Sequence, residues 1–283
     1  MDYRDIVDSL RIKPAGGKHA IEVMAIGVEW ATPLDDAELQ KLQDVFNATS
    51  EIAKFLPSHT PVRSLMLQIG LPGNSPSSFV PEDRAGGFDL KRFDPNGAVL
   101  WALSVRPDFI SCNCMAYDRW ATVKPQSVEL LHPFLTAAMN CGHEIKAVGL
   151  QYQDAFTIEG GVDNAALQSL FRQDSPLLPT HLLAMPSLWH SHQGWYSISP
   201  KNRRVLNNVN LDLLEQTPNH LARINGQHRV FSVTHDGKET CLIEQEDLEQ
   251  ILDFLHEENK KVLIGILSDK MLDQIGLDAG EKK

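Results

Sequence analysis

The stretch that most constrains the fold is residues 144–156, EIKAVGLQYQDAF. Side chains on a β-strand point alternately to its two faces. One face of this stretch would be apolar as far as Asp154, and the other would carry glycine and amide side chains. The two rows are Val148, Leu150, Tyr152 and Asp154 on the first face, and Gly149, Gln151, Gln153 and Ala155 on the second. The alternation predicts a strand that turns polar on its apolar face only at its end.

The same patterns predict the remaining elements of the chain. Apolar alternation between turn residues indicates strands, and apolar residues at helical spacing indicate helices. We expect strands at 21–30, 62–71, 98–106, 109–117, 181–187, 189–199, 204–215 and 223–234, the last turning near Asn225-Gly226, and helices at 32–56, 127–141, 164–172, 246–267 and 268–276. This order predicts an α+β fold with largely antiparallel sheets and helices packed on one face.

The predicted elements fall into two halves. Residues 1–172 form an N-terminal α+β half, which includes a loop at 72–97 rich in Pro, Gly, Ser and Asp. Residues 173–283 form a β-rich C-terminal half that ends in a long helix. The boundary is expected in the proline-containing link at 173–179. Both halves run from strands to a helix, which makes an internal duplication a hypothesis.

Composition limits the classes of partner. The formal net charge of −11 argues against a non-specific binder of nucleic acid or of anionic membranes, because both need a basic surface. No apolar run reaches the roughly 20 residues that a membrane span needs, and the N-terminus has no secretory pattern. The four cysteines are too sparse for a disulfide scaffold. We therefore expect a cytoplasmic protein with reduced thiols.

Two pairs of residues have side chains that could bind zinc. Cys112 and Cys114 would share one face of a strand, and Cys141 and His143 lie where the next helix ends. Zinc takes four such ligands in a tetrahedron, so these four could form one site if the elements are neighbours. The alternative is that the cysteines are buried small apolar side chains and that the protein has no cofactor.

A second cluster is rich in aromatic and histidine side chains. Its members are Trp189, His190, His192, Trp195 and Tyr196. His190 and His192 would share a strand face, but no carboxylate stands at a set spacing from them. Exposed Trp and Tyr favour protein interfaces, so we interpret the cluster as a surface for binding another protein.

Signatures of catalysis are missing from the sequence. It has no G-x-S-x-G motif, phosphate-binding loop, dinucleotide-binding glycine pattern or H-E-x-x-H motif. Asp154 and Asp212 would both lie near strand ends and could meet as an acid/base pair. Whether the protein is an enzyme is left uncertain by the sequence, which favours a non-enzymatic protein.

Two motifs in the first half resemble a known family. A strand pair ends in Tyr117-x-x-Trp120, a helix follows, and residues 148–156 then read VGLQYQDAF. This order resembles a sporadically distributed bacterial family of about this length, whose function is not established. The family's strand typically reads Gly-Leu-Arg-Tyr-hydrophobic-Asn/Asp. Here Gln151 replaces the arginine and Gln153 the hydrophobic residue.

The C-terminal helix is similar to the same family. It contains Leu255-His256-Glu257, then Val262-Leu263 where the family tends to have Phe, and Ser268 follows where it tends to have Thr. The resemblance implies an α+β fold and a bacterial cytoplasmic protein, and it brings no catalytic residues. A patchy distribution suits antiviral (phage) defence or another mobile locus.

These observations lead to one expected function and two alternatives. We expect a non-enzymatic protein-binding, accessory or sensor protein of a bacterial cytoplasmic system, whose partner is another protein. The first alternative is a metal-dependent hydrolase that uses the Cys/His cluster. The second is a sensor of a small ligand held between the two halves. The sequence does not indicate an oligomeric state.

Overall fold

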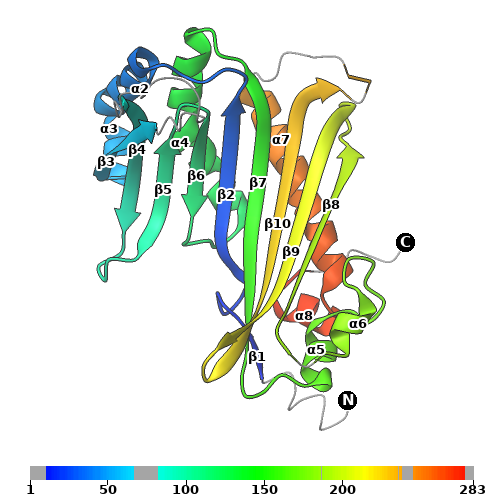
Figure 1. The fold of residues 1–283 in the computed structure, drawn as a ribbon. Helices are drawn as coiled ribbons and strands as arrows, with labels where there is room; N and C mark the ends of the chain where they lie inside the picture. The colour runs from blue at the N-terminus through cyan, green and yellow to red at the C-terminus, as the bar shows by residue number, and fades with distance from the viewer. Residues whose placement is uncertain (1–10, 67–81, 186, 235, 238–244, 278–283) are drawn as a thin grey trace, which may run out of the picture.

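The ten strands in the described part of the chain belong to a single antiparallel sheet. The computed structural model describes residues 11–66, 82–185, 187–234, 236–237 and 245–277. The sheet runs in the order β3-β4-β5-β6-β2-β7-β10-β9-β8, with β1 also paired to β7, and helices lie behind it (Figure 1). The predicted α+β class with helices on one face is confirmed.

The elements have the following bounds. The strands are β1 (Ile12–Pro14), β2 (Ile21–Trp30), β3 (Ser58–Met66), β4 (Glu82–Phe93), β5 (Val99–Val105), β6 (Phe109–Cys114), β7 (Ile145–Ile158), β8 (Trp189–Ile198), β9 (Arg203–Gln216) and β10 (Asn219–Thr234). The helices are α2 (Asp36–Ala48), α3 (Ser50–Phe55), α4 (Trp120–Asn140), α5 (Asn164–Leu170), α6 (Thr180–Leu183), α7 (Gln245–Ile266) and α8 (Asp269–Gln274).

The sheet has two halves, β3-β4-β5-β6-β2 and β7-β10-β9-β8, which meet at the antiparallel pair β2–β7. Strand β7 therefore goes with the C-terminal strands, although the predicted division at 173–179 placed it in the N-terminal half. Each half begins with a central strand, continues through two short helices, and returns through outer strands to a long helix. The last strand of each half lies beside its first, because β6 pairs with β2 and β10 pairs with β7. The halves therefore repeat one order of elements, with one strand more in the first. The sheet is continuous across the boundary predicted at 173–179.

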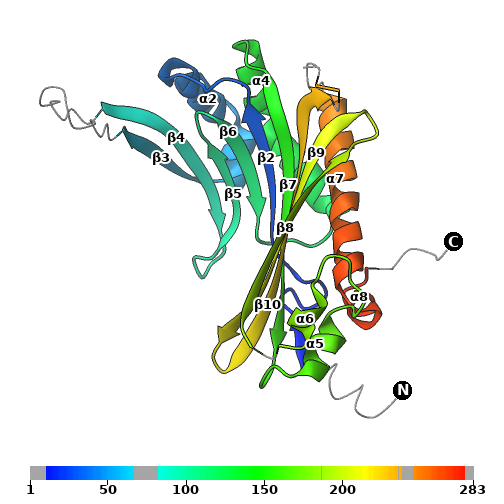
Figure 2. The same ribbon diagram turned by 45° about the vertical axis from the view of Figure 1, so that its right-hand side comes forward.

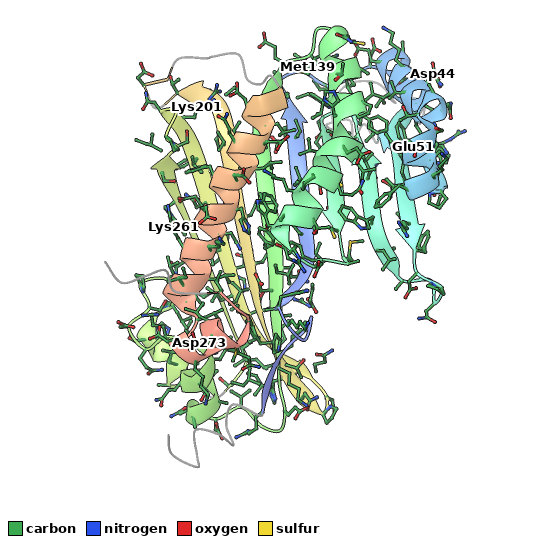
Figure 3. All side chains as sticks on the ribbon, turned by 180° about the vertical axis from the view of Figure 1, so that it is seen from behind. Asp44, Glu51, Met139, Lys201, Lys261 and Asp273 are labelled. Carbon is green, nitrogen blue, oxygen red and sulfur yellow. The ribbon has the colours of Figure 1, made fainter. Side chains whose placement is uncertain are left out.

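The core lies between the sheet and its helices. Helix α4 contacts β6, and α7 contacts both β7 and β10, so both helices lie across the rear face (Figure 3). Buried apolar side chains form two clusters, and β7 contributes to both, with Leu150 and Tyr152 in one and Phe156 and Ile158 in the other. The strands of the second half are inclined to those of the first (Figure 2), as expected of a twisted sheet.

Two helices begin at side-chain caps, and α2 begins at Asp36, four residues after the start predicted at 32. The Asp35 side chain accepts a hydrogen bond from the Glu38 N–H, and the Glu38 side chain accepts one from the Asp35 N–H, which completes a capping box. Ser268 caps α8 by accepting from the Met271 N–H. These caps use residues three apart, so local sequence is enough to find them.

Helix α4 begins seven residues before its predicted start. A helix that starts at 127 would have Ser127 as its cap. Ser127 is instead buried inside the helix, and its hydroxyl donates to the Val123 carbonyl at 2.8 Å. Pro125 lies early in the helix, where it removes one hydrogen bond, and burial of Val123 and packing of Trp120 on the core outweigh that loss.

The predicted loop at 72–97 contains a strand. Residues 82–93 form β4, whose buried Phe88 and Leu90 alternate with polar Asp89 and Lys91. The sequence pattern favoured a loop here, because Gly86-Gly87 and the many charged residues are typical of loops. The first part of the predicted loop, residues 72–81, lies outside the described residues, as do residues 67–71 of the strand expected at 62–71.

Two predictions in the second half are wrong. Residues 180–183 form the helical turn α6 instead of the strand expected at 181–187. Strand β10 runs straight through Asn225-Gly226, where we expected a turn. A Cβ on Gly226 would lie 2.2 Å from Oδ1 of Asn259 on α7, so this glycine allows the helix to approach the sheet. The chain turns at Thr217-Pro218, which is a cis peptide bond.

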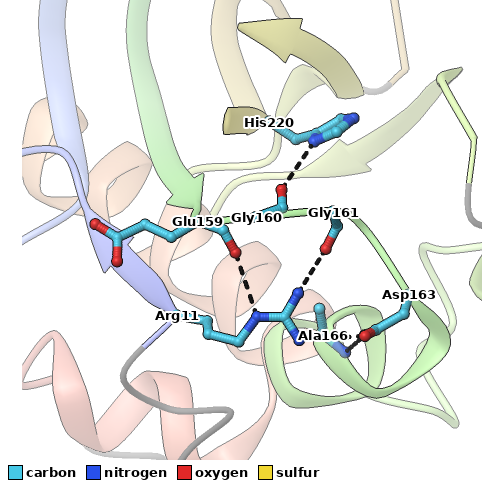
Figure 4. Close-up of polar contacts among 7 residues, drawn as sticks. All are labelled: Arg11, Glu159, Gly160, Gly161, Asp163, Ala166 and His220. Atoms are coloured by element: carbon cyan, nitrogen blue, oxygen red, sulfur yellow. Dashed lines mark hydrogen bonds and ion pairs between the residues drawn. The ribbon is translucent and has the colours of Figure 1, made fainter. Parts of the chain in front are cut away.

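An arginine ties the start of the described chain to the end of β7 (Figure 4). The Arg11 guanidinium donates to the carbonyls of Glu159 (3.2 Å) and Gly161 (2.6 Å) and pairs with Asp163 at 3.1 Å. Asp163 also caps α5 by accepting from the Ala166 N–H. One side chain thus holds β1, the turn after β7 and the first turn of α5 together.

Replacing Arg11 by Ala should lower the free energy of unfolding by about 1–3 kcal/mol, because charge-assisted hydrogen bonds to two carbonyls and a carboxylate are lost. Urea unfolding followed by circular dichroism measures this change. Arg11→Lys is the matched control and should recover part of the loss, since it retains the charge without the planar fork. Equal stability of all three proteins would contradict this role of Arg11.

Candidate binding surface

One face of the sheet, the face turned toward the viewer in Figure 1, carries none of the described helices. Along β2, β7, β9 and β10, buried side chains alternate with partly exposed ones. The buried row packs against the helices, so the exposed row lies on the face without helices. We call this the open face. The amide side chains on it include Asn113, Gln151, Gln153, Asn208, Asn210, Asn225 and Gln227. It is therefore rich in groups that both donate and accept hydrogen bonds.

Charges on the open face are paired with one another. Arg229 pairs with Glu29 across β10, β7 and β2, and Arg223 lies 3.6 Å from Glu22. The Glu22 side chain also accepts a hydrogen bond from Gln153 at 2.8 Å. The face is consequently close to neutral in a chain that carries a net charge of −11.

A hollow of about 280 Å³ lies at the centre of the open face. Strands β6, β2, β7 and β10 line it, so it lies over the junction of the two halves. Its floor contains Gly27 and Gly149, which are register partners on β2 and β7. Arg229, Glu29 and Phe109 are among the larger side chains around it.

The predicted aromatic and histidine cluster lies on strand β8, at one border of the sheet. His190, His192 and Tyr196 are exposed on the open face, whereas Trp189 is 8% exposed and packs against Phe171 with ring centroids 5.8 Å apart. Trp195 lies on the same side as Trp189 and is half-buried against the core. The five residues predicted as one surface are therefore divided between two faces of the strand.

The outer edge of β8 presents backbone groups that no described segment pairs with. The Ser199 N–H donates inward to the Arg203 carbonyl at 2.9 Å, and β8 pairs with β9 without a register shift. Backbone direction alternates along an antiparallel strand, so alternate residues point outward. These are His190, His192, Gly194, Tyr196 and Ile198.

The two edge strands of the sheet differ in the residues that shield their outward backbone groups. Proteins shield exposed edges with proline and with charged side chains. The opposite edge strand, β3, contains Pro61 and Arg63. Strand β8 contains neither a proline nor a charged Lys, Arg, Asp or Glu, and Tyr196 and Ile198 on it are 65% and 48% exposed. Of the two edges, β8 is the one suited to accept another strand.

The candidate zinc ligands are spread along the length of α4. Cys112 and Cys114 lie in the core on β6, and burial raises the pKa of their thiols to about 12 and about 11. Cys141 follows the C-terminal end of α4, a helix roughly 30 Å long at 1.5 Å per residue. His143 lies beside Cys141 and contacts Glu38 at 2.9 Å.

Among the described residues, no group of three or more His, Cys, Asp or Glu side chains is placed to hold a metal ion. Zinc binding by these four residues stays a prediction that depends on a rearrangement.

Polar side chains form a seam where α7 meets β7 and α4, namely buried Tyr152, half-buried His256 and Trp120, and exposed Asp253. The Tyr152 hydroxyl lies 2.9 Å from Nδ1 of His256, and His256 stacks on Trp120 with ring centroids 4.5 Å apart. Burial lowers the pKa of His256 to about 4, with Lys260 as a further cause, so the ring is neutral at pH 7. The indole N–H of Trp120 donates to Asp253 at 2.8 Å.

Asp154 lies two residues after Tyr152 on the same face of β7 and lacks a hydrogen-bond partner for Oδ2 among the described residues. The side chain is 2% exposed. Burial, with a smaller effect of Glu22, raises the pKa of its carboxyl group to about 7. Asp212 lies on the open face beside His190, so the two carboxylates occupy opposite faces of the sheet. The acid/base pair considered from sequence does not form.

Three features of this surface could not be predicted from the sequence, namely the paired glycines, the outer edge of β8 and the row of amides. Gly27 and Gly149 each interrupt a predicted strand, which is a signal of a close backbone approach, but their pairing depends on register. The outward groups of β8 and the exposure of Ile198 depend on which strand is at the edge. The Asn and Gln residues of the open face come from several strands, and only the strand pairing brings them onto one face.

No family model matches this chain, and a comparison with curated proteins finds no match. None of the helices in the described part of the chain is long and apolar enough to cross a membrane.

Replacing Asp154 by Asn should stabilise the protein at pH 8 and have little effect at pH 4. The folded state holds the Asp154 proton more tightly than the unfolded state, whose pKa is about 3.9. Wild-type stability should therefore fall as pH rises from about 4 to about 7, by on the order of 4 kcal/mol. Asn cannot ionise, so the difference between the two proteins grows over this interval.

Urea unfolding of both proteins at each pH measures the difference, and the common contribution of His256 cancels in it. Asp118→Asn, at an exposed site paired with Arg119, is the control and should show no such trend. Destabilisation by Asp154→Asn at every pH would contradict the raised pKa.

Proposed function

We propose that this chain is a non-enzymatic protein-binding module that accepts an extended segment of a partner protein along β8. The observation that carries the proposal is the unprotected outer edge of β8, with five residues whose backbone groups point outward. Strand addition to a sheet edge uses these backbone groups for affinity and alternate side chains for specificity. The chain would act as a receptor without a reaction of its own.

Side chains beside the edge define the kind of segment that fits. On the open face, an incoming strand would meet Tyr196 and Ile198 near one end and His190 and His192 near the other. The Arg204 guanidinium lies over the Tyr196 ring, 6.0 Å from its centroid. A segment with an aromatic or branched apolar residue against Tyr196 would bury the exposed apolar surface. We expect the part of the segment that pairs with β8 to be uncharged, because β8 has no Lys, Arg, Asp or Glu side chain to pair with a charge.

The resemblance to a sporadically distributed bacterial family supports a setting for this binding. In that setting the partner is encoded nearby in a cytoplasmic system such as phage defence or another mobile locus. The metal-dependent hydrolase is the weaker alternative, because the described structure does not gather the Cys and His residues.

Replacing His192 by Pro should abolish partner binding, because it removes an outward N–H from the centre of the edge. His192→Thr is the matched control, since it removes the same side chain and keeps the N–H. A photo-crosslinking residue at position 196, introduced in the host cells, reports the partner. We expect a crosslinked protein that His192→Thr retains and His192→Pro reduces at least tenfold.

The same crosslinker at Lys261, an exposed position on α7, should not capture this protein. Circular dichroism should show that both variants fold. Equal capture by His192→Pro and His192→Thr would contradict strand addition. Capture of a second copy alone, with a dimer in light scattering, would contradict a partner of different sequence.

A further inference from the structure

The central hollow of the open face is the strongest unexplained feature of the molecule. It is distinct from the β8 edge, since β9 and β8 contribute none of its lining residues. It lies where β2 and β7 join the two halves of the sheet, and its size of about 280 Å³ is just below the usual range of ligand pockets. A ligand there would contact both halves at once.

Two facing glycines in central strands need a physical reason. Glycine in a strand interior is unfavourable, because it adds backbone entropy to the unfolded chain and brings no side chain to pack. Neither Gly27 nor Gly149 has a positive φ angle. A Cβ on Gly27 would have no described atom outside the adjacent residues within 4 Å, so no neighbour demands glycine at this position.

The second glycine has a partial structural role. A Cβ on Gly149 would lie 3.1 Å from Cγ of Arg229, which is a tight contact with a flexible side chain. Together the two glycines leave a floor of bare peptide planes on the open face, flanked by Ala25 and Ser111. Such a floor is shaped for a flat ring lying parallel to the sheet.

The walls of the hollow are neutral and bear both donors and acceptors. Arg229 and Glu29 neutralise each other on one side. Amides of Asn113, Gln151 and Gln227 line the remainder, and Gln151 donates to Asn225 at 3.1 Å. Carboxamide, guanidinium and carboxylate groups are the side chains that read the edges of nucleobases. Because the arginine is already paired, the hollow has no excess positive charge for a phosphate.

We propose that the hollow binds a purine base or nucleoside, stacked on the Gly27–Gly149 floor with its edges hydrogen-bonded to the surrounding amides. The ring would also contact the aromatic face or edge of Phe109, which lines the same hollow. Aromatic contact and edge recognition together distinguish a purine from an aliphatic metabolite. The site makes the protein a sensor of a small ligand in addition to a protein-binding module.

Gly27→Thr separates this site from the stability of the fold. Threonine favours strands and meets open space here, so the melting temperature should equal or exceed that of the wild type. Isothermal titration calorimetry with adenine, guanine, adenosine and guanosine should give binding by at least one of them to the wild type. Gly27→Thr should weaken that binding at least tenfold. Val23→Thr, on the same strand outside the hollow, should leave it unchanged.

Further probes test the ligand class. The matching nucleoside monophosphate should bind no more tightly than the nucleoside, and Gln227→Leu should weaken binding at least tenfold. The proposal is overturned if no purine binds, if Gly27→Thr binds as well as the wild type, if the monophosphate binds much more tightly, or if free amino acids bind and purines do not. His192→Pro should leave purine binding unchanged, so strand addition and ligand binding can fail separately.

Discussion

The antiparallel pairing of β7 with strands on both of its sides holds the two halves of the molecule together. One side of β7 pairs with β2 and then with β1, and the other pairs with β10 from Phe231 opposite Ala147 to His220 opposite Ile158. Side chains of β7 enter both core clusters. Disrupting β7 would separate the two halves of the sheet from each other and would remove side chains from both core clusters. The two halves of the sheet therefore depend on one shared strand.

Covering only one face of the sheet has consequences for the polar groups on that face. His228 on β10 is buried with Nδ1 2.8 Å from Oδ1 of Asn207 and Nε2 3.4 Å from Oδ1 of Asn259. Gly226 makes room for Asn259 to reach it. Buried polar groups are costly unless they find such partners, and for the buried Asp154 the pKa of the carboxyl group rises to about 7 instead. The contact between His228 and Asn259 couples α7 to the sheet.

The sheet has two separate candidate binding surfaces, the outer edge of β8 and the hollow on the open face. The β8 edge offers backbone groups in one direction, in the plane of the sheet, whereas the central hollow offers side chains and bare peptide planes above that plane. Both belong to one sheet, and β9 and β10 lie between them. A strand added at β8 would extend the same sheet whose centre forms the hollow.

Local patterns were sufficient for most of the elements and for the direction of many side chains. The alternation in residues 144–156 placed Tyr152 and Asp154 on one face of a strand, and apolar residues at helical spacing located most of the helices, because both patterns depend on residues close in the chain. Tertiary structure alone decided that β4 is a strand, that Gly226 serves a helix contact, and that Trp189 and Trp195 face away from Tyr196. It also placed Gly27 opposite Gly149, kept Cys141 far from Cys114, and made β8 an edge. Each of these depends on register and strand order, which are set by partners distant in sequence, so no local pattern could reveal them.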